Sequence, residues 1–405
     1  MPIATGVEKV FGVKKETTWG ALAGPTGAVL RRRVSCDLSL KKDTYESNEI
    51  RADYQVADMR HGVRRVEGTL DGEVSPGSYQ LEMAAALRRL FTTVAAQTAV
   101  GITVAVAGST WTLTRGAGSY IAAAGFKVGD VVRLSVGALN AANLSKNLFI
   151  LALTGTVMTV IPLNGVALVA EGPIAGCTVS LIGRKTFIPL TGHTDESMTY
   201  ENWFPSVTQS ERFVGVKMRG MEISLPPTGM SNIKFDLFGR DMSSAAAAYF
   251  TTPTALGVSG VLAAVNGAVM VNGAAVALLT GLSLKLDNGL SGDPVVGSNL
   301  LPAIFQGRAR VSGQMTVYFE DATYRNIFDQ ETEVSIAAAF ATSVSATADF
   351  VALSMPRIKA GGADKDDGEK GLVQTIPFTA LLPLTGGDGF ANEQSTLSIQ
   401  DSLAA

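Results

Sequence analysis

The chain repeats part of itself, and this constrains its fold more than any other feature of the sequence. Leu38-Ser39-Leu40-Lys41 recurs as Leu282-Ser283-Leu284-Lys285, a shift of 244 residues. The stretch GVRRVEG at 62–68 recurs as GRARVSG at 307–313, a shift of 245 residues. Further along the shift falls to 137 residues, where Trp203 aligns with Phe340 and Met218 with Met355. The repeat therefore predicts two copies of one domain, the first of which carries an insertion of 108 residues, the difference between the last two shifts.

The repeat also sets the expected domain boundaries. The first copy comprises residues 1–91 and 186–250, the insertion residues 92–185, and the second copy residues 251–405. A chain of 405 residues is long enough for three domains, and a hydrophobic content of 46% allows each to bury a core. Duplicated domains in one chain commonly build closed rings from fewer subunits, so assembly is the first function to consider.

Strand signals dominate both copies. Short runs of Val, Ile, Thr and Phe lie between Gly, Asn, Asp and Pro clusters, which is typical of a mainly β fold. The clearest alternation covers residues 66–74, and the matching stretch of the second copy repeats it. One face of each strand is apolar, and the other carries Glu67, Thr69, Asp71 and Glu73 in the first copy and Ser312, Gln314 and Thr316 in the second.

A helix is expected after each of these strands. Ser75 suits an N-cap and Pro76 the first helical position. In the second copy a shorter helix is expected over 321–329, with Tyr324, Ile327 and Phe328 facing inward. The predicted fold is a β-sandwich or barrel with one flanking helix, present as a tandem duplicated domain.

The insertion reads as a small all-β domain. Short strands separated by Gly and Asn turns are expected at 101–106, 109–114, 131–136, 148–153, 157–162 and 176–181. This pattern predicts a β-barrel or β-sandwich. Because insertions are accepted at exposed tips, we expect it to project outward from the assembly.

Two long connections of similar length, 42–61 and 286–306, follow the first repeated strand of each copy. Loops this long in compact domains are usually functional. The first is rich in charges of both signs and the second nearly neutral. A contact surface is favoured over a simple solvated loop, and the candidate contact residues are Tyr45, Glu49, Arg51, Asp53, Asp58, Arg60, Val295 and Leu300.

The bulk composition argues against several classes of protein. Charged residues make up 17% and the net charge is −3, which disfavours tight binding of nucleic acid. Cys36 and Cys177 fall in different predicted domains, so two reduced thiols are expected and no disulfide. Residues 254–283 lack charge, but Asn266-Gly267 and Asn272-Gly273 indicate strands and tight turns, so no membrane span and no secretory signal are expected.

We find no motif for catalysis or for a cofactor. His61 and His193 are the only histidines, and neither has a partner at zinc-ligand spacing. No phosphate loop, nucleophile elbow or dinucleotide fingerprint is present. The acidic run 364–369 begins like a calcium loop but has Thr375 where the final Glu belongs. The chain is therefore expected to be neither an enzyme nor a metal or cofactor carrier.

Several motifs resemble the tail tube protein of long-tailed, non-contractile (siphovirus-type) bacteriophages. The resemblance covers nearly the whole chain in motif order. It is carried by Thr17-Thr18-Trp19-Gly20, by the stretches 46–53, 58–68 and 210–213, by Leu225-Pro226-Pro227-Thr228-Gly229, and by 305–313 and 366–371.

The resemblance implies a structural role in the virion tail, for a protein made in the host bacterial cytoplasm. Members form rings that stack into a hollow tube around a tape measure protein, with tail terminator and distal tail proteins as further partners. The tube conducts double-stranded DNA during genome ejection without binding it specifically. Many such rings hold six single-domain subunits, so two copies per chain imply a homotrimeric ring with pseudo-sixfold symmetry.

Within that picture, the polar strand faces are candidates for the channel wall, and an outward, solvent-facing position is an equal alternative. A neutral or acidic wall would let DNA slide, whereas a basic wall would bind phosphates. The long loops are candidates for ring-to-ring contact. The alternative function is a virion-surface or secreted adhesin that binds carbohydrate, which would need exposed aromatic residues clustered on loops of the insertion. The insertion has only Trp111, Tyr120, Phe126 and Phe149, which are too few and too strand-like to favour that function.

Overall fold

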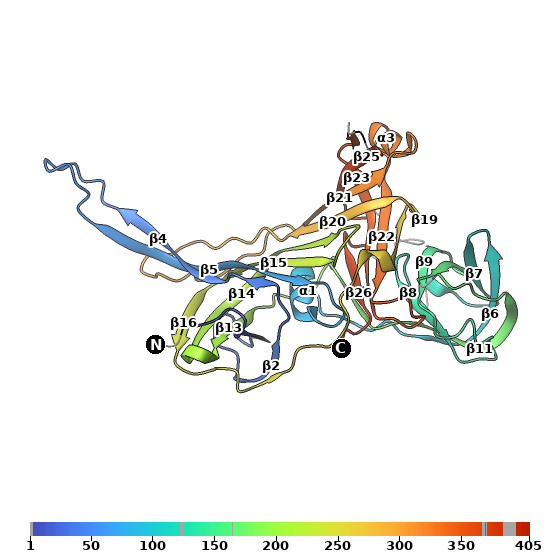
Figure 1. The fold of residues 1–405 in the computed structure, drawn as a ribbon, viewed down its shortest axis with the longest axis horizontal. Helices are drawn as coiled ribbons and strands as arrows, with labels where there is room; N and C mark the ends of the chain where they lie inside the picture. The colour runs from blue at the N-terminus through green and yellow to red at the C-terminus, as the bar shows by residue number, and fades with distance from the viewer. Residues whose placement is uncertain (1–2, 122–124, 164, 367–368, 370, 384–393) are drawn as a thin grey trace.

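The molecule is an elongated, mainly β structure, as the sequence predicts (Figure 1). The computed structural model describes residues 3–121, 125–163, 165–366, 369, 371–383 and 394–405. A long β-hairpin extends from one end, a β-barrel lies at the other, and helix α1 (Gln80–Leu87) lies between them (Figure 1).

The N-terminal half contains a series of seven antiparallel strands. In hydrogen-bonded order they are β4 (Ser39–Glu46), β5 (Met59–Glu73), β15 (Asn232–Gly239), β14 (Gln209–Leu225), β13 (Met198–Phe204), β1 (Val10–Lys15) and β2 (Thr26–Leu30). The apolar face predicted from the alternation is buried. Val66 and Leu70 of β5, and Val74 directly after the strand, lie in the main core.

The C-terminal half contains a second series of seven antiparallel strands. In hydrogen-bonded order they are β20 (Leu279–Asp287), β21 (Arg310–Tyr318), β25 (Val373–Ala380), β23 (Phe350–Ala360), β22 (Val334–Ala341), β18 (Gly267–Val271) and β19 (Ala274–Ala275). Asn272 and Gly273 join the last two strands with φ of 50° and 79°. The predicted short strands and the tight turn at Asn272-Gly273 are confirmed, whereas Asn266 ends a 3-10 turn and Gly267 begins β18 with an extended φ of −144°.

One strand pairing joins the two halves into a single sheet. The C-terminal part of β14 pairs with β20, from Gly220 opposite Asp287 to Leu225 opposite Leu282. Leu282, Leu284 and Leu286 are buried at this joint, at 3%, 2% and 0% exposure. The seven strands β4, β5, β15, β14, β20, β21 and β25 therefore form one continuous sheet.

Helices α1 and α3 differ in their surroundings. Helix α1 begins at Gln80, later than predicted, because Gly77 takes a left-handed φ of 78° and interrupts the turn that starts at Pro76. The Ser75 hydroxyl accordingly bonds Ser78 and caps no helix. Helix α3 (Thr323–Asp329) lies where predicted, but the expected inward orientation of Phe328 is wrong, since its side chain is 40% exposed.

Residues 92–185 contain a closed barrel with a strand at each of the six predicted positions, although Gln97–Ala107 and Glu171–Leu181 begin four and five residues earlier than predicted. The order of the six strands is β10 (Val157–Pro162), β7 (Thr110–Arg115), β6 (Gln97–Ala107), β11 (Glu171–Leu181), β8 (Val131–Ser135) and β9 (Leu148–Leu153). At its base Thr92 and Lys185 exchange two backbone hydrogen bonds, of 2.9 and 3.0 Å. The chain thus enters and leaves the barrel at adjacent points.

The barrel packs directly on the C-terminal half and shares a core with it. Met270, Ala337, Ala339, Phe350 and Ala352 of β18, β22 and β23 belong to the same buried cluster as the barrel interior. These alanines occupy the strand face turned toward the barrel, where small side chains allow close approach. The barrel is therefore packed against the rest of the molecule and is not a separate unit joined only by a linker.

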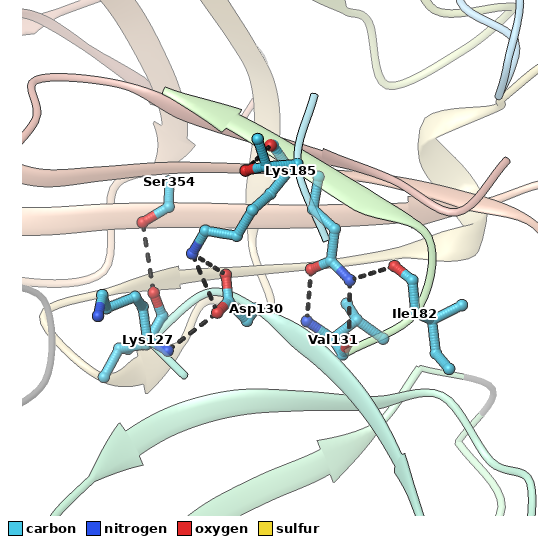
Figure 2. A network of polar contacts seen from close by, with 9 residues as sticks. Lys127, Asp130, Val131, Ile182, Lys185 and Ser354 are labelled. Atoms are coloured by element: carbon cyan, nitrogen blue, oxygen red, sulfur yellow. Dashed lines mark hydrogen bonds and ion pairs between the residues drawn. The ribbon is translucent and has the colours of Figure 1, made fainter. Parts of the chain in front are cut away.

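Polar contacts fix the same junction (Figure 2). The Lys185 ammonium, 2% exposed, lies 3.1 Å from a carboxylate oxygen of Asp130. The Gln400 amide spans the junction: its oxygen accepts a bond from the Val131 N–H, and its nitrogen donates to the Val131 and Ile182 carbonyls. Strand β26 (Ser398–Asp401), which carries Gln400, pairs with β12 (Arg184–Phe187) and β23. Strand β26 thereby links the barrel to the C-terminal half through the hydrogen bonds of Gln400.

Short strands complete the described structure. They are β3 (Ser35–Cys36), β16 (Asp241–Ala245), β17 (Thr252–Thr254) and β24 (Asp364–Lys365), with 3-10 turns at Pro205–Val207 and Ala264–Asn266.

Candidate functional site

The structure brings the predicted polar residues of both halves onto one face of the continuous sheet. Glu67, Thr69, Asp71 and Glu73 lie on β5, and Ser312, Gln314 and Thr316 on β21, with β15, β14 and β20 between them. Alternate residues of the same strands point into the main core, so these side chains point away from it. The sequence placed each set on a polar face, and the β14–β20 joint makes the two faces one.

The strand register aligns this face into rows that cross the sheet. One row runs through Asp71, Lys234, Glu222, Lys285 and Ser312. The signs of charge alternate along it, so that each charged residue lies opposite one of the other sign. The next row, through Glu73, Asn232, Ser224, Ser283 and Gln314, is almost uncharged.

Ion pairs on this face are partly exposed. The Lys234 ammonium lies 3.8 Å from Asp71, and the Arg219 guanidinium 3.0 Å from Asp236. Pairs of this kind contribute at most about 1 kcal/mol each to stability. Their main effect is electrostatic, because acids and bases neutralise one another locally and no run of bases spaced for DNA phosphates results.

The first long loop is shorter than predicted and lies at the end of a hairpin arm. β4 continues to Glu46 and β5 begins at Met59, so Tyr45 and Arg60 are paired strand residues and only 47–58 is loop. The predicted loop boundaries at 42 and 61 were wrong because its charged residues alternate along exposed strands, a pattern that β-propensity alone does not favour. This arm, which consists of β4, the loop 47–58 at its tip and the part of β5 that pairs with β4, extends beyond the rest of the molecule (Figure 1).

Charged residues at the arm tip pair with near neighbours in sequence. Arg51 bonds Asp53 at 2.9 Å and thereby lowers the pKa of that carboxyl, and Arg60 bonds Asp58 at 2.8 Å. Glu49 is exposed beside them. The sequence reading missed three exposed apolar side chains among these charges: Ile50 at 103%, Tyr54 at 98% and Val56 at 65% exposure. Their presence in a polar loop is itself the signal that could have identified them.

The second long loop, residues 288–309, folds back on the base of the arm. The Arg64 N–H donates to the Asn299 carbonyl at 2.9 Å, and Arg64 forms a parallel bridge with Leu300. Leu301 and Ile304 bury against Val63 and Phe238. Leu300 therefore packs on the arm base, whereas Val295 is 46% exposed near the turn of the loop. The expected similarity in length is therefore not observed: the loops 47–58 and 288–309 differ in both length and structure.

No site for a metal or a disulfide emerges from the part of the chain that the structure describes. Cys36 and Cys177 are both free thiols, and no group of three His, Cys, Asp or Glu side chains gathers there. Among the same residues, no helix combines the length and apolar character needed to cross a bilayer.

Comparison with known families gives the class of protein to which this mainly β chain belongs. The model of the phage tail tube protein family matches residues 6–380, so this chain belongs to that family. The family consists of structural tail proteins that assemble into a tube, and its members are located in the virion tail. A search of curated proteins gave no match.

Proposed function

We propose that three copies of this chain form a ring of six tube domains, and that the rings stack into the tail tube of a siphovirus-type phage. The supporting observation is the strand order. β4-β5-β15-β14-β13-β1-β2 in the N-terminal half has the same sequence of antiparallel neighbours as β20-β21-β25-β23-β22-β18-β19 in the C-terminal half. We assign these halves to the two domains of the repeat, 1–91 with 186–250 and 251–405, and the barrel to an insertion at 92–185.

Electron microscopy of the purified protein tests this assembly. Rings or tubes with a central hole and threefold symmetry are expected. Compact monomers at all concentrations, or rings built from six chains, would contradict it.

We further propose that the polar sheet face lines the channel through which double-stranded DNA leaves the capsid. Glu67, Asp71 and Glu73 in one half and Ser312 and Gln314 in the other would then alternate around the wall. The alternating charges favour this role. DNA binds a basic surface because neutralised phosphates release their counterions, and a wall without a basic stripe does not offer this gain in free energy. DNA would slide along it without specific contacts.

A charge reversal tests the wall assignment. Replacing Glu67, Asp71 and Glu73 with Lys is expected to leave tubes intact and to slow triggered DNA ejection by at least about tenfold, less so as salt is raised. Fluorescence of released DNA measures the rate. The matched Gln triple variant keeps the shape without the positive charge and should eject near the wild-type rate. Wild-type ejection by the Lys variant would exclude these residues from the wall.

We also propose that the arm tip contacts the neighbouring ring, and that a tape measure protein fills the channel before ejection, with tail terminator and distal tail proteins at the tube ends. The support for the first contact is the exposed Ile50 and Tyr54 at the end of a projecting hairpin. The other partners follow from family membership alone.

The adhesin alternative lacks its required surface. It needs aromatic side chains exposed on barrel loops, but Tyr120, Phe126 and Phe149 are each 0% exposed in the barrel core. Trp111 lies partly buried on strand β7. The tube function is therefore favoured.

A further inference from the structure

We propose that neighbouring chains join through one defined pair of sheet edges: β4 of one copy pairs with the C-terminal end of β23 of the next. The register repeats that of the β14–β20 joint inside each chain. This inference rests on the proposed ring, and it specifies the surface that closes it.

The internal joint provides the template. Met221, Ile223 and Leu225 of β14 lie opposite Leu286, Leu284 and Leu282 of β20. The Asn288 N–H donates to the Arg219 carbonyl at 2.8 Å, so the odd-numbered residues of β14 turn their backbone groups toward β20.

The 137-residue shift maps this edge of β14 onto β23, where Ile223 corresponds to Ala360 and Leu225 to Gly362. The Gly361 N–H donates to the Pro377 carbonyl at 2.7 Å, and the Leu381 N–H donates to the Arg357 carbonyl at 2.8 Å. These odd-numbered positions thus face β25, and Ala360 and Gly362 face the opposite side. Within the described ranges no strand pairs with that side beyond Ile358, which lies opposite Val334.

The 244-residue shift maps the partner edge of β20 onto β4, where Leu284 corresponds to Leu40 and Leu282 to Leu38. The Asp37 N–H donates to the Thr69 carbonyl at 3.2 Å, so odd-numbered positions face β5 and Leu38 and Leu40 face outward. Described strands pair with β4 only through β5. At both open edges, the residues that turn their backbone N–H and C=O groups outward are therefore the counterparts of the residues that form the hydrogen bonds of the β14–β20 joint. Open edges of this kind readily pair with another chain.

One side chain on each edge is left half-covered where the internal joint covers its counterpart, whereas Leu38, at 4% exposure, is as buried as its counterpart Leu282. Leu284 and Ile223 are each 2% exposed, whereas their counterparts Leu40 and Ala360 are only partly buried at the margin of the core. Helix α3, which packs on β23, shows the same difference. Its Phe328 is 40% exposed, and the corresponding Met83 of α1 is 0% exposed. A neighbouring chain would complete the burial at this end.

The mapped register places Gly361 opposite Ser39, Ala360 opposite Leu40 and Lys359 opposite Lys41. The last pair brings two ammonium groups together. Glu331 lies 2.6 Å from the Lys359 ammonium and is 77% exposed, so it supplies a carboxylate at that point of the edge.

Cysteine cross-linking tests both the surface and the register. Ser39 and Gly361 would form a non-hydrogen-bonded pair with Cα atoms about 4.5 Å apart, within disulfide range. A Cβ at Gly361 meets nothing closer than 3.6 Å, so the substitution is tolerated. The double variant S39C/G361C should give covalent trimers on a non-reducing gel. The offset pair K41C/G361C, whose Cα atoms would be about 7–8 Å apart, should give roughly tenfold less. The native thiols are present in every variant, including the wild-type control.

The outcomes separate the joint from the function. Tubes that cross-link through S39C/G361C, and through L40C/A360C as a second in-register pair, support the joint. Tubes that cross-link only through the offset pair, or through neither in-register pair, overturn it and leave the ring standing. If reduced variants and wild type form no ring or tube at all, the proposed function fails and the joint with it.

Discussion

Asp401 links the end of the chain to the turn that precedes α1. Its carboxylate oxygens accept bonds from the Gly77 N–H at 2.8 Å and the Leu403 N–H at 2.9 Å. Burial, partly opposed by these bonds, raises the pKa of Asp401 to about 6 from an ordinary 3.8. The folded state thus holds a proton that the unfolded state has already released between these two values.

The sign of the resulting pH dependence follows. Because the folded pKa is raised, the contribution of Asp401 to the free energy of unfolding is greatest below about pH 4 and falls as pH rises to about 6, by on the order of 3 kcal/mol. Denaturant unfolding of wild type and Asp401→Asn between pH 4 and 7 measures this. The difference between the two should decline with pH; a constant difference would contradict the assignment.

At the same residue scale, sequence pattern identified some side chains and not others. Period-two alternation was sufficient to place Glu67 and Asp71 on one face, because that periodicity follows from backbone geometry. It could not identify the contact of Lys185 with Asp130 or of Gln400 with Val131. Those partners are separated by 55 and 269 residues in the sequence, and they meet only because the barrel packs against the C-terminal half.

At the scale of elements, the arm is the part most open to direct test. Replacing Ile50 and Tyr54 with Ser removes two almost fully exposed apolar side chains, so the free energy of unfolding should change by less than about 0.5 kcal/mol. Stacking of rings should be lost while single rings persist, because the arm base and the β4 edge are unchanged. Sedimentation and electron microscopy distinguish the two states.

The control for the arm is a pair of Ser replacements at Val295 and Val296, which are exposed on the second loop away from the arm tip. If this control abolishes stacking and the arm variant does not, the assignment of the stacking surface moves to the second loop. Deletion of 45–57 should behave as the arm variant does.

Element types were predictable, and their surroundings were not. Helix α3 was found from its local pattern, but its exposure depends on what lies beside it. The arm strands β4 and β5, which extend further than predicted, illustrate the same limit, since exposed charged strands lack the apolar stripe that marks a half-buried strand. Barrel strands β9 and β10 match their predicted bounds, whereas β6 and β11 begin four and five residues before their predicted starts.

At the scale of the whole molecule, the shared core changes what removal of the barrel should do. The sequence predicts that residues 92–185 project outward from the assembly, and a segment in that position could be removed without uncovering the core of the rest of the molecule. Excision of 93–184 would instead uncover Met270 and Phe350, each 0% exposed, along with the alanine faces of β22 and β23. We expect the excised protein to aggregate, as judged by size-exclusion chromatography.

A matched variant separates exposure from assembly. Excision combined with Met270→Thr and Phe350→Thr should restore solubility at least in part and allow tubes to form. Soluble, unassembled protein from this variant would give the barrel a direct role in assembly. Tubes from the simple excision would show that the shared core contributes little.

The unequal fate of the two long loops limits how one ring can sit on another. One loop projects at the end of β4 and β5, and the other is folded against Arg64 at the arm base. In a ring of three chains, only every second domain would then carry a projecting contact. Successive rings would have three equivalent angular settings, 120° apart, where a ring of six identical subunits has six. The helical twist of the tube is therefore defined modulo 120°, and averaging images over six positions would blur the arms.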